Sequence, residues 1–86
     1  MNFFITGTAG FIGNAVALSL LDSGHNVYGI DNFNDYYDIR LKIARHTRLT
    51  QHTNYLHSKI DICDPALRDL VLEYSPDVFI HLAAQA

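Results

Sequence analysis

A glycine-rich segment near the beginning of the chain constrains the fold more than any other feature. Residues 6–13 read Thr-Gly-Thr-Ala-Gly-Phe-Ile-Gly, between a short apolar run and an apolar stretch with helical periodicity. Gly7 permits a tight turn, Gly10 lets backbone approach a ligand, and Gly13 lets a helix lie close to a strand. The first N–H groups of a helix lack intrahelical acceptors and attract anions. The segment therefore predicts a strand–turn–helix unit that binds a diphosphate.

The rest of the chain alternates between apolar strand patterns and helical patterns. The predicted strands are residues 2–6, 26–30, 55–60 and 78–82. The predicted helices are residues 11–23, 39–49 and 65–74. Gly24 is expected to end the first helix, Asp38 and Asp64 to cap the second and third, and Ser75-Pro76 to stop the third. A polar, aromatic loop is expected over residues 32–38.

This βαβαβαβ order predicts the α/β class. Strands separated by helices pair in parallel through right-handed crossovers. We expect a Rossmann-type, doubly wound sheet with strand order 3-2-1-4 and a ligand crevice between the first and fourth strands. Residues 1–86 are interpreted as the N-terminal portion of an NAD(P)-binding domain, and the sheet as truncated.

Composition limits the partners and the setting of the chain. Its 86 residues allow one domain, and 49% hydrophobic with 17% charged residues favours a folded chain. A net charge of -3 argues against nucleic acid as the main partner. No apolar run is long enough for a membrane span, and no basic leader precedes the first strand. Cys63, the single cysteine, is expected to be a small packed side chain in a reduced, cytoplasmic protein.

Asp31 is the strongest candidate for a polar ligand contact. It follows Gly13 by 18 residues and comes at the end of the second predicted strand. A carboxylate there accepts hydrogen bonds from the ribose hydroxyls of adenosine. Its charge would repel a 2′-phosphate, so the sequence favours NAD over NADP. The alternative is a solvated aspartate at a strand end.

Two further segments follow predicted strands at the same edge of the sheet. Asp61 could accept a hydrogen bond from the adenine amino group while Ile62 packs on the ring; the alternative is an ordinary loop aspartate. Small residues after the fourth strand would let backbone approach the cofactor. These are Leu82, Ala83 and Ala84.

Together these motifs resemble the extended short-chain dehydrogenase/reductase family, the NAD-dependent nucleotide-sugar epimerases and dehydratases. Residues 31–42, Asp-Asn-Phe-Asn-Asp-Tyr-Tyr-Asp-Ile-Arg-Leu-Lys, are similar to the UDP-glucuronate 4-epimerase group. The resemblance covers the whole of this chain, which corresponds to only about the first quarter of such an enzyme. With Gly13 added for packing, it implies a cofactor site formed by Gly7, Gly10, Phe11, Ile12, Asp31, Asn32, Asp61, Ile62, Leu82, Ala83 and Ala84.

The resemblance also implies the chemistry of the parent enzyme. In the family, NAD takes a hydride from C4 of the sugar, and a Ser or Thr polarises the oxygen. The tyrosine of a Tyr-x-x-x-Lys pair takes the hydroxyl proton, and the lysine lowers the pKa of that tyrosine. Those groups and the sugar-binding domain lie beyond the length of this chain. We therefore expect no catalytic residue here and a nucleotide sugar only in a full-length parent. The alternatives are a stand-alone binding or oligomerising module, a 4,6-dehydratase fragment, or a remnant that binds nothing.

Other polar residues have weaker functional interpretations. Tyr55 and Lys59 have the Tyr-x-x-x-Lys spacing, but a strand would place them about 13 Å apart, too far for a catalytic pair. Among the basic residues, Arg45 and Arg48 are expected on a solvated helix face. The roles of Arg40 and Lys42 stay open between phosphate attraction and solvation. The five histidines lack metal-ligand spacing, so no metal is predicted.

The predicted fourth strand suggests self-association. Residues 78–82 would form an apolar strand at the edge of the sheet, and exposed edges pair with other chains. We expect a homodimer or larger assembly, which light scattering of the purified chain tests; a clean monomer would contradict it.

Overall fold

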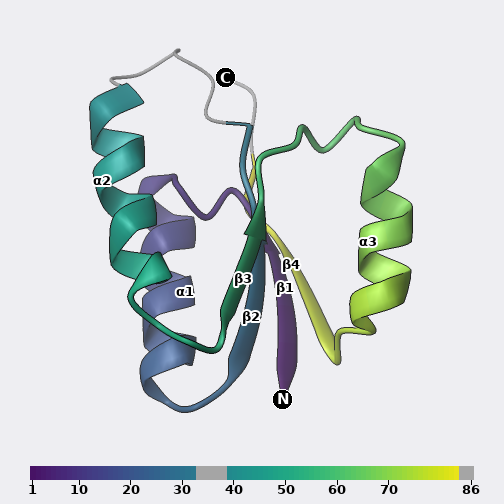
Figure 1. The fold of residues 1–86 in the computed structure, drawn as a ribbon, viewed down its shortest axis with the longest axis horizontal. Helices are drawn as coiled ribbons and strands as arrows, with labels where there is room; N and C mark the ends of the chain where they lie inside the picture. The colour runs from purple at the N-terminus through teal and green to yellow at the C-terminus, as the bar shows by residue number, and fades with distance from the viewer. Residues whose placement is uncertain (33–38, 84–86) are drawn as a thin grey trace.

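The computed structural model describes residues 1–32 and 39–83, which form a parallel sheet covered by helices on both faces (Figure 1). The strands are β1 (Asn2–Thr6), β2 (Asn26–Ile30), β3 (Tyr55–Ser58) and β4 (Val78–His81). The helices are α1 (Phe11–Asp22), α2 (Ile39–Thr50) and α3 (Ala66–Tyr74). Every paired strand is parallel and the order is β3-β2-β1-β4. The α/β class and the 3-2-1-4 order are therefore confirmed.

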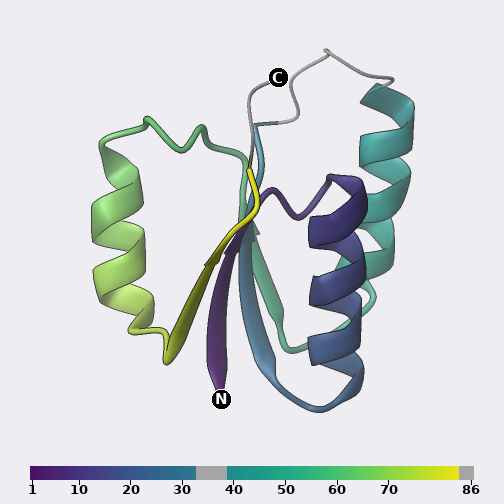
Figure 2. The same ribbon diagram turned by 180° about the vertical axis from the view of Figure 1, so that it is seen from behind.

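The three helices divide between the two faces of the sheet. Figure 2, from the opposite side, shows α1 and α2 together on one face and α3 alone on the other. Right-handed crossovers produce this division, because the chain moves outward from β1 through β2 to β3 and then reverses, crossing back to β4 on the other side of β1. The carboxyl ends of all strands consequently meet at one edge, where the glycine-rich turn lies.

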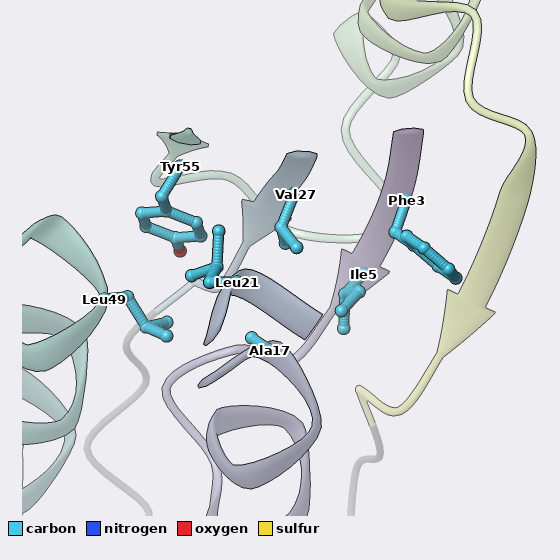
Figure 3. Packing of buried hydrophobic residues seen from close by; sticks show 7 residues of the cluster. All are labelled: Phe3, Ile5, Ala17, Leu21, Val27, Leu49 and Tyr55. Carbon is cyan, nitrogen blue, oxygen red and sulfur yellow. The ribbon is translucent and has the colours of Figure 1, made fainter. Parts of the chain in front are cut away.

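Alternate strand residues build the core beneath α1 and α2 (Figure 3). Phe3 and Ile5 of β1 point to this face, because side chains in a strand alternate between faces. Opposite them, the helices contribute small or branched apolar residues. The buried cluster consists of Phe3, Ile5, Ala17, Leu21, Val27, Leu49 and Tyr55.

The face toward α3 is aromatic. Phe4 of β1 is fully buried, and its ring stacks between Tyr28 and Phe79 at centroid distances of 5.1 and 5.4 Å. Tyr74 of α3 meets the Phe4 ring edge-on at 6.2 Å. None of the α3 residues is fully buried, and Phe79 is 46% exposed. This face is therefore less completely covered than the face toward α1 and α2.

Most differences from the expected boundaries are small and have local causes. β3 ends at Ser58 because its ladder partner β2 ends at Ile30, the residue that pairs with Ser58. The α3 helix begins at Ala66, one residue later than expected, with Pro65 directly before it in a helical conformation. The Ala66 N–H donates to Asp64 Oδ1 at 2.9 Å, so the predicted Asp64 still accepts a hydrogen bond from the start of the helix. The helix stops before Pro76, with Ser75 in a left-handed conformation at φ 52°. The predicted cap Asp38 and loop residues 33–38 lie outside the described residues.

The expectation for Cys63 is wrong. Its side chain is exposed. It lies in a turn closed by a hydrogen bond from Asp64 N–H to the Asp61 carbonyl.

As expected, β4 is an edge strand of the sheet. Self-association through this edge stays a prediction. Within residues 1–32 and 39–83, no helix is both long and apolar enough to cross a bilayer.

Candidate functional site

The glycine-rich segment forms the predicted sharp turn at the carboxyl end of β1. Gly7 has φ 83°, a left-handed conformation that favours glycine, and its N–H donates to the Ile30 carbonyl at 2.8 Å. The N–H of Gly10 donates back to the Gly7 carbonyl at 3.1 Å. The turn is thus held on both sides, by the end of β2 and by its own backbone.

Close backbone packing explains why two of the glycines cannot be replaced. A Cβ on Gly13 would lie 2.0 Å from the Gly7 carbonyl oxygen, and a Cβ on Gly7 would lie 2.8 Å from the Ala83 nitrogen. A Cβ on Gly10 would meet one described atom within 4 Å, the Gly7 carbonyl oxygen at 3.3 Å. Gly7 and Gly13 are therefore packing requirements, whereas a Cβ on Gly10 would meet a single, less severe backbone contact.

The amino end of α1 begins directly after Gly10. Gly10 occupies the N-cap position and has no side chain to accept the first helical N–H groups, and the first turn holds no acidic residue. Helix amino ends with unsatisfied N–H groups favour anions. The neighbouring Phe11 and Ile12 side chains are exposed. This end of the helix can therefore bind an anionic group flanked by apolar surface.

Asp31 points toward the turn, as the sequence predicted. Its Oδ2 accepts a hydrogen bond from Ala9 N–H at 3.1 Å, and its Oδ1 accepts one from Lys42 Nζ at 3.1 Å. The carboxylate is almost buried. Asp31 thus fixes the glycine turn against the end of β2 and ties the first turn of α2 to the same point.

Asn32 and Asp61 lie together beyond the ends of β2 and β3. Asn32 Nδ2 donates to Asp61 Oδ2 at 3.0 Å, and Cys63 N–H donates to Asp61 Oδ1 at 3.0 Å. The hydrogen bond from Cys63 N–H, followed by that from Asn32, lowers the pKa of Asp61. Asp61 is therefore ionised at neutral pH and acts as an acceptor, which is the property its predicted role needs.

The fourth-strand segment is held by a residue that the sequence did not single out. Thr6 Oγ1 accepts hydrogen bonds from Leu82 N–H at 3.0 Å and Ala83 N–H at 3.1 Å. It also lies 2.8 Å from His81 Nδ1, to which its hydroxyl proton can be donated. Thr6 is fully buried and so positions residues 82–83 beside Gly7. The available signal was a hydroxyl residue at a strand end directly before the first glycine. Ala84 lies outside the described residues.

The basic residues of α2 divide differently from the expectation. Arg45 was expected on a solvated face, but its guanidinium lies 5.6 Å from the centre of the Phe11 ring, and Nη1 is 3.5 Å from the Ala9 carbonyl. The cause is the packing of α2 on α1, where Asn14 Nδ2 donates to the Arg45 carbonyl at 2.8 Å. Arg48 is exposed, as expected.

Tyr55 is a core residue. Its side chain is buried under α1 and α2, and its hydroxyl donates to Thr8 Oγ1 at 3.2 Å. Burial raises its pKa to about 12. A Cβ on Gly29 would lie 2.5 Å from this hydroxyl, so Gly29 leaves room for it, a requirement that the sequence did not reveal. Lys59 is exposed beyond the end of β3, which agrees with setting this pair aside.

The structure therefore gathers most of the predicted residues at one edge of the sheet. The glycine turn, Asp31 and residues 82–83 are linked by hydrogen bonds or backbone contact, and Asn32 joins Asp61 nearby. Ile62, the residue after Asp61, is half-buried. Within residues 1–32 and 39–83, no group of three potential ligand side chains is arranged to hold a metal ion.

Comparisons with known proteins agree with this geometry. A probable UDP-glucuronate 4-epimerase from Rhizobium meliloti is 46% identical over 87 residues, covering 100% of this chain and 26% of the relative. The UDP-glucuronate 4-epimerase of Thermodesulfobacterium geofontis is 44% identical over 85 residues, covering 98% of this chain and 26% of the relative. The crystal structure of UDP-glucuronic acid 4-epimerase from Bacillus cereus in complex with NAD matches with a TM-score of 0.88 and 33% identity, covering 100% of this chain and 28% of that chain.

This chain spans about a quarter of the length of the curated relatives it matches. A family model, described as GDP-mannose 4,6 dehydratase, matches residues 4–86. That match covers nearly the whole sequence and includes the glycine turn, Asp31 and the end of β4. The chain therefore belongs to the family described as GDP-mannose 4,6 dehydratase.

Proposed function

We propose that this chain binds NAD and forms the NAD-binding part of a nucleotide-sugar epimerase of the UDP-glucuronate 4-epimerase type. The observation that carries the proposal is the position of Asp31, whose carboxylate contacts the glycine turn at the amino end of α1. This arrangement puts an anion site and a ribose acceptor next to each other, as adenosine diphosphate requires. The B. cereus epimerase with bound NAD, which has the same fold, supports the assignment.

Each predicted residue has a distinct role in this proposal. The diphosphate binds the first N–H groups of α1 at Phe11 and Ile12, with Gly10 leaving room for it. The adenosine ribose donates hydrogen bonds from its hydroxyl groups to the Asp31 carboxylate. The adenine binds near the Asn32–Asp61 pair, with Ile62 against the ring. Leu82, Ala83 and Ala84 bring backbone close to the cofactor near the fourth strand.

The substrate of the full protein is proposed from the relatives. Both curated relatives are named as UDP-glucuronate 4-epimerases, so we propose a UDP-sugar as the substrate class. When bound, NAD supplies reversible hydride transfer. The described residues bind and orient its adenosine end, and we assign no acid–base step to them, because Tyr55 is buried in the core. The catalytic pair and the sugar site are proposed to belong to other parts of the full-length protein.

The proposal is tested by calorimetric titration of NAD into the 86-residue chain and its Asp31→Asn variant. The amide still accepts a hydrogen bond from Ala9 N–H, but it loses the charge that strengthens bonds from the ribose hydroxyls. Hydrogen bonds to charged groups contribute about 1.5–3 kcal/mol and those between neutral groups about 0.5–1.5 kcal/mol, so we expect the loss of charge to lower NAD affinity by about five- to tenfold.

Asp69→Asn is the matched control, because it removes the same charge from an exposed position in the first turn of α3. It should leave NAD affinity unchanged. Absence of saturable NAD binding to the unsubstituted chain, or equal affinities for all three proteins, would contradict the proposed site.

A further inference from the structure

A groove with a volume of about 340 Å³ lies between α1 and α2. One side of each helix lines it, because the lining residues of each helix are spaced by three or four positions. The lining is mostly apolar, and its charged part is basic. The residues that matter below are Phe11, Ala15, Leu18, Leu41, Arg45 and Arg48.

The described part of the chain leaves large apolar side chains of this groove exposed. Phe11 is 76% exposed and Leu41 is 50% exposed. Apolar side chains gathered in this way on a surface mark an interaction site. Grooves of this kind accept an amphipathic helix, whose apolar side chains enter the groove at helical spacing.

The charge of α2 indicates which kind of helix fits the groove. Four of the six Lys and Arg residues of the chain belong to α2, and none of its nine Asp and Glu residues does. Arg45 and Arg48 both line the groove, and none of the described lining residues is acidic. The groove therefore complements an acidic amphipathic helix.

The chain itself contains such a helix on the opposite face of the sheet. Residues 61–77, which include α3, hold five of the nine acidic residues and a single Lys or Arg. On α3, Leu72 is 64% exposed, and the adjacent Glu73 is exposed as well. No described residue of α3 is fully buried. The outward side of α3 thus offers an apolar side chain next to a negative charge, the complement of the groove.

We propose that copies of this chain associate head to tail, with α3 of one copy docked in the α1–α2 groove of the next. Leu72 enters the apolar part of the groove, and the Glu73 carboxylate pairs with the Arg48 guanidinium. The proposal does not rest on the NAD site, and it differs from pairing between β4 edges.

The arrangement of the helices determines how such an assembly grows. α1 and α2 cover one face of the sheet and α3 covers the other, so the two contact surfaces of one copy point in opposite directions (Figure 2). A contact between two different surfaces is heterologous, and it adds copies in a row where a two-fold dimer would stop at two. The average size of the assembly therefore rises with concentration.

The contact is expected to be weak and sensitive to salt. Since α3 has nine residues, the docked surface is at the small end of protein interfaces, where association is transient. The paired charges are on exposed side chains, so added salt screens their attraction. Low ionic strength and high protein concentration favour the assembly.

Sedimentation velocity of the 86-residue chain over a concentration series at low salt tests the proposal. Arg48→Glu and Glu73→Arg each replace the attraction by a repulsion of similar size, so each is expected to lower the association constant by about tenfold. Leu72→Ser removes the apolar contact and is expected to weaken association as well. Lys59→Glu is the matched control, because it reverses an exposed positive charge outside the groove and should change nothing.

Mixing the two charge-reversed variants makes the test decisive. Arg48→Glu and Glu73→Arg are each expected to associate poorly alone, but an equal mixture regains association, because every groove then meets an α3 of opposite charge. Circular dichroism checks that each variant is folded, and Arg48→Gln replaces Arg48→Glu if that protein is not.

Three outcomes overturn the inference. The first is a monomer at every concentration. The second is association that Arg48→Glu, Glu73→Arg and Leu72→Ser leave unchanged, which pairing of β4 edges would give. The third is association that both charge reversals weaken but that their mixture does not restore.

Discussion

Gly13→Ala is expected to lower the free energy of unfolding by about 3 kcal/mol or more, enough to leave much of the chain unfolded. Alanine normally stabilises a helix by about 1 kcal/mol relative to glycine, so the direction of the effect is not obvious from the helix alone. Here the new Cβ would lie 2.0 Å from the Gly7 carbonyl oxygen, a backbone atom that cannot rotate away. The clash therefore outweighs the gain in helix propensity.

Urea denaturation followed by circular dichroism measures this difference. Gly24→Ala is the control, because a Cβ there would meet nothing within 4 Å and the substitution is strained only by its φ of 86°. That strain costs about 1 kcal/mol. Equal losses for the two variants would contradict the close contact between α1 and the glycine turn.

Phe4→Ala is expected to lower the free energy of unfolding by about 3–5 kcal/mol. Phe4 is fully buried in the central strand, and its ring lies between Tyr28 and Phe79 and meets Tyr74 of α3. Truncation would leave a cavity between the Tyr28 and Phe79 rings and remove one of the aromatic contacts of α3 with this face. A domain this small has little stability to lose.

Phe79→Ala provides the comparison for this prediction. Phe79 contributes the same type of stacked ring from β4, but it is 46% exposed, so its removal is expected to cost clearly less. The two variants are compared by thermal and urea unfolding under identical conditions. A loss for Phe79→Ala equal to that for Phe4→Ala would show that burial does not rank the two rings.

The strand order and the glycine turn could be predicted because they depend on local backbone requirements. A positive φ at Gly7 and a helix lying on the turn at Gly13 leave few alternatives to glycine, and alternating strands and helices leave few topologies. The position of Asp31 followed from the same logic, since a residue directly after β2 must lie at the edge where the turn lies.

The contacts that adjust the site could not be predicted in the same way. The ion pair of Lys42 with Asp31 and the packing of Arg45 on Phe11 depend on how α2 lies against α1, which periodicity does not specify. The hydrogen bonds from Leu82 and Ala83 to Thr6 join residues from opposite ends of the sequence. The prediction that Cys63 packs against the protein was wrong for a related reason, because the sequence did not show that its side chain lies exposed in a turn.

The bond between Thr6 and Leu82 has a consequence for the order in which the molecule assembles. It closes a loop of 76 residues, whereas Gly7 reaches Ile30 across 23. Loop-closure entropy grows with the logarithm of loop length, so the longer closure costs about 1 kcal/mol more. The contacts between the glycine turn and the end of β2 can therefore form early in folding, because they join residues that are closer in sequence. The contacts between Thr6 and the end of β4 are expected to form later, because they require a long-range encounter.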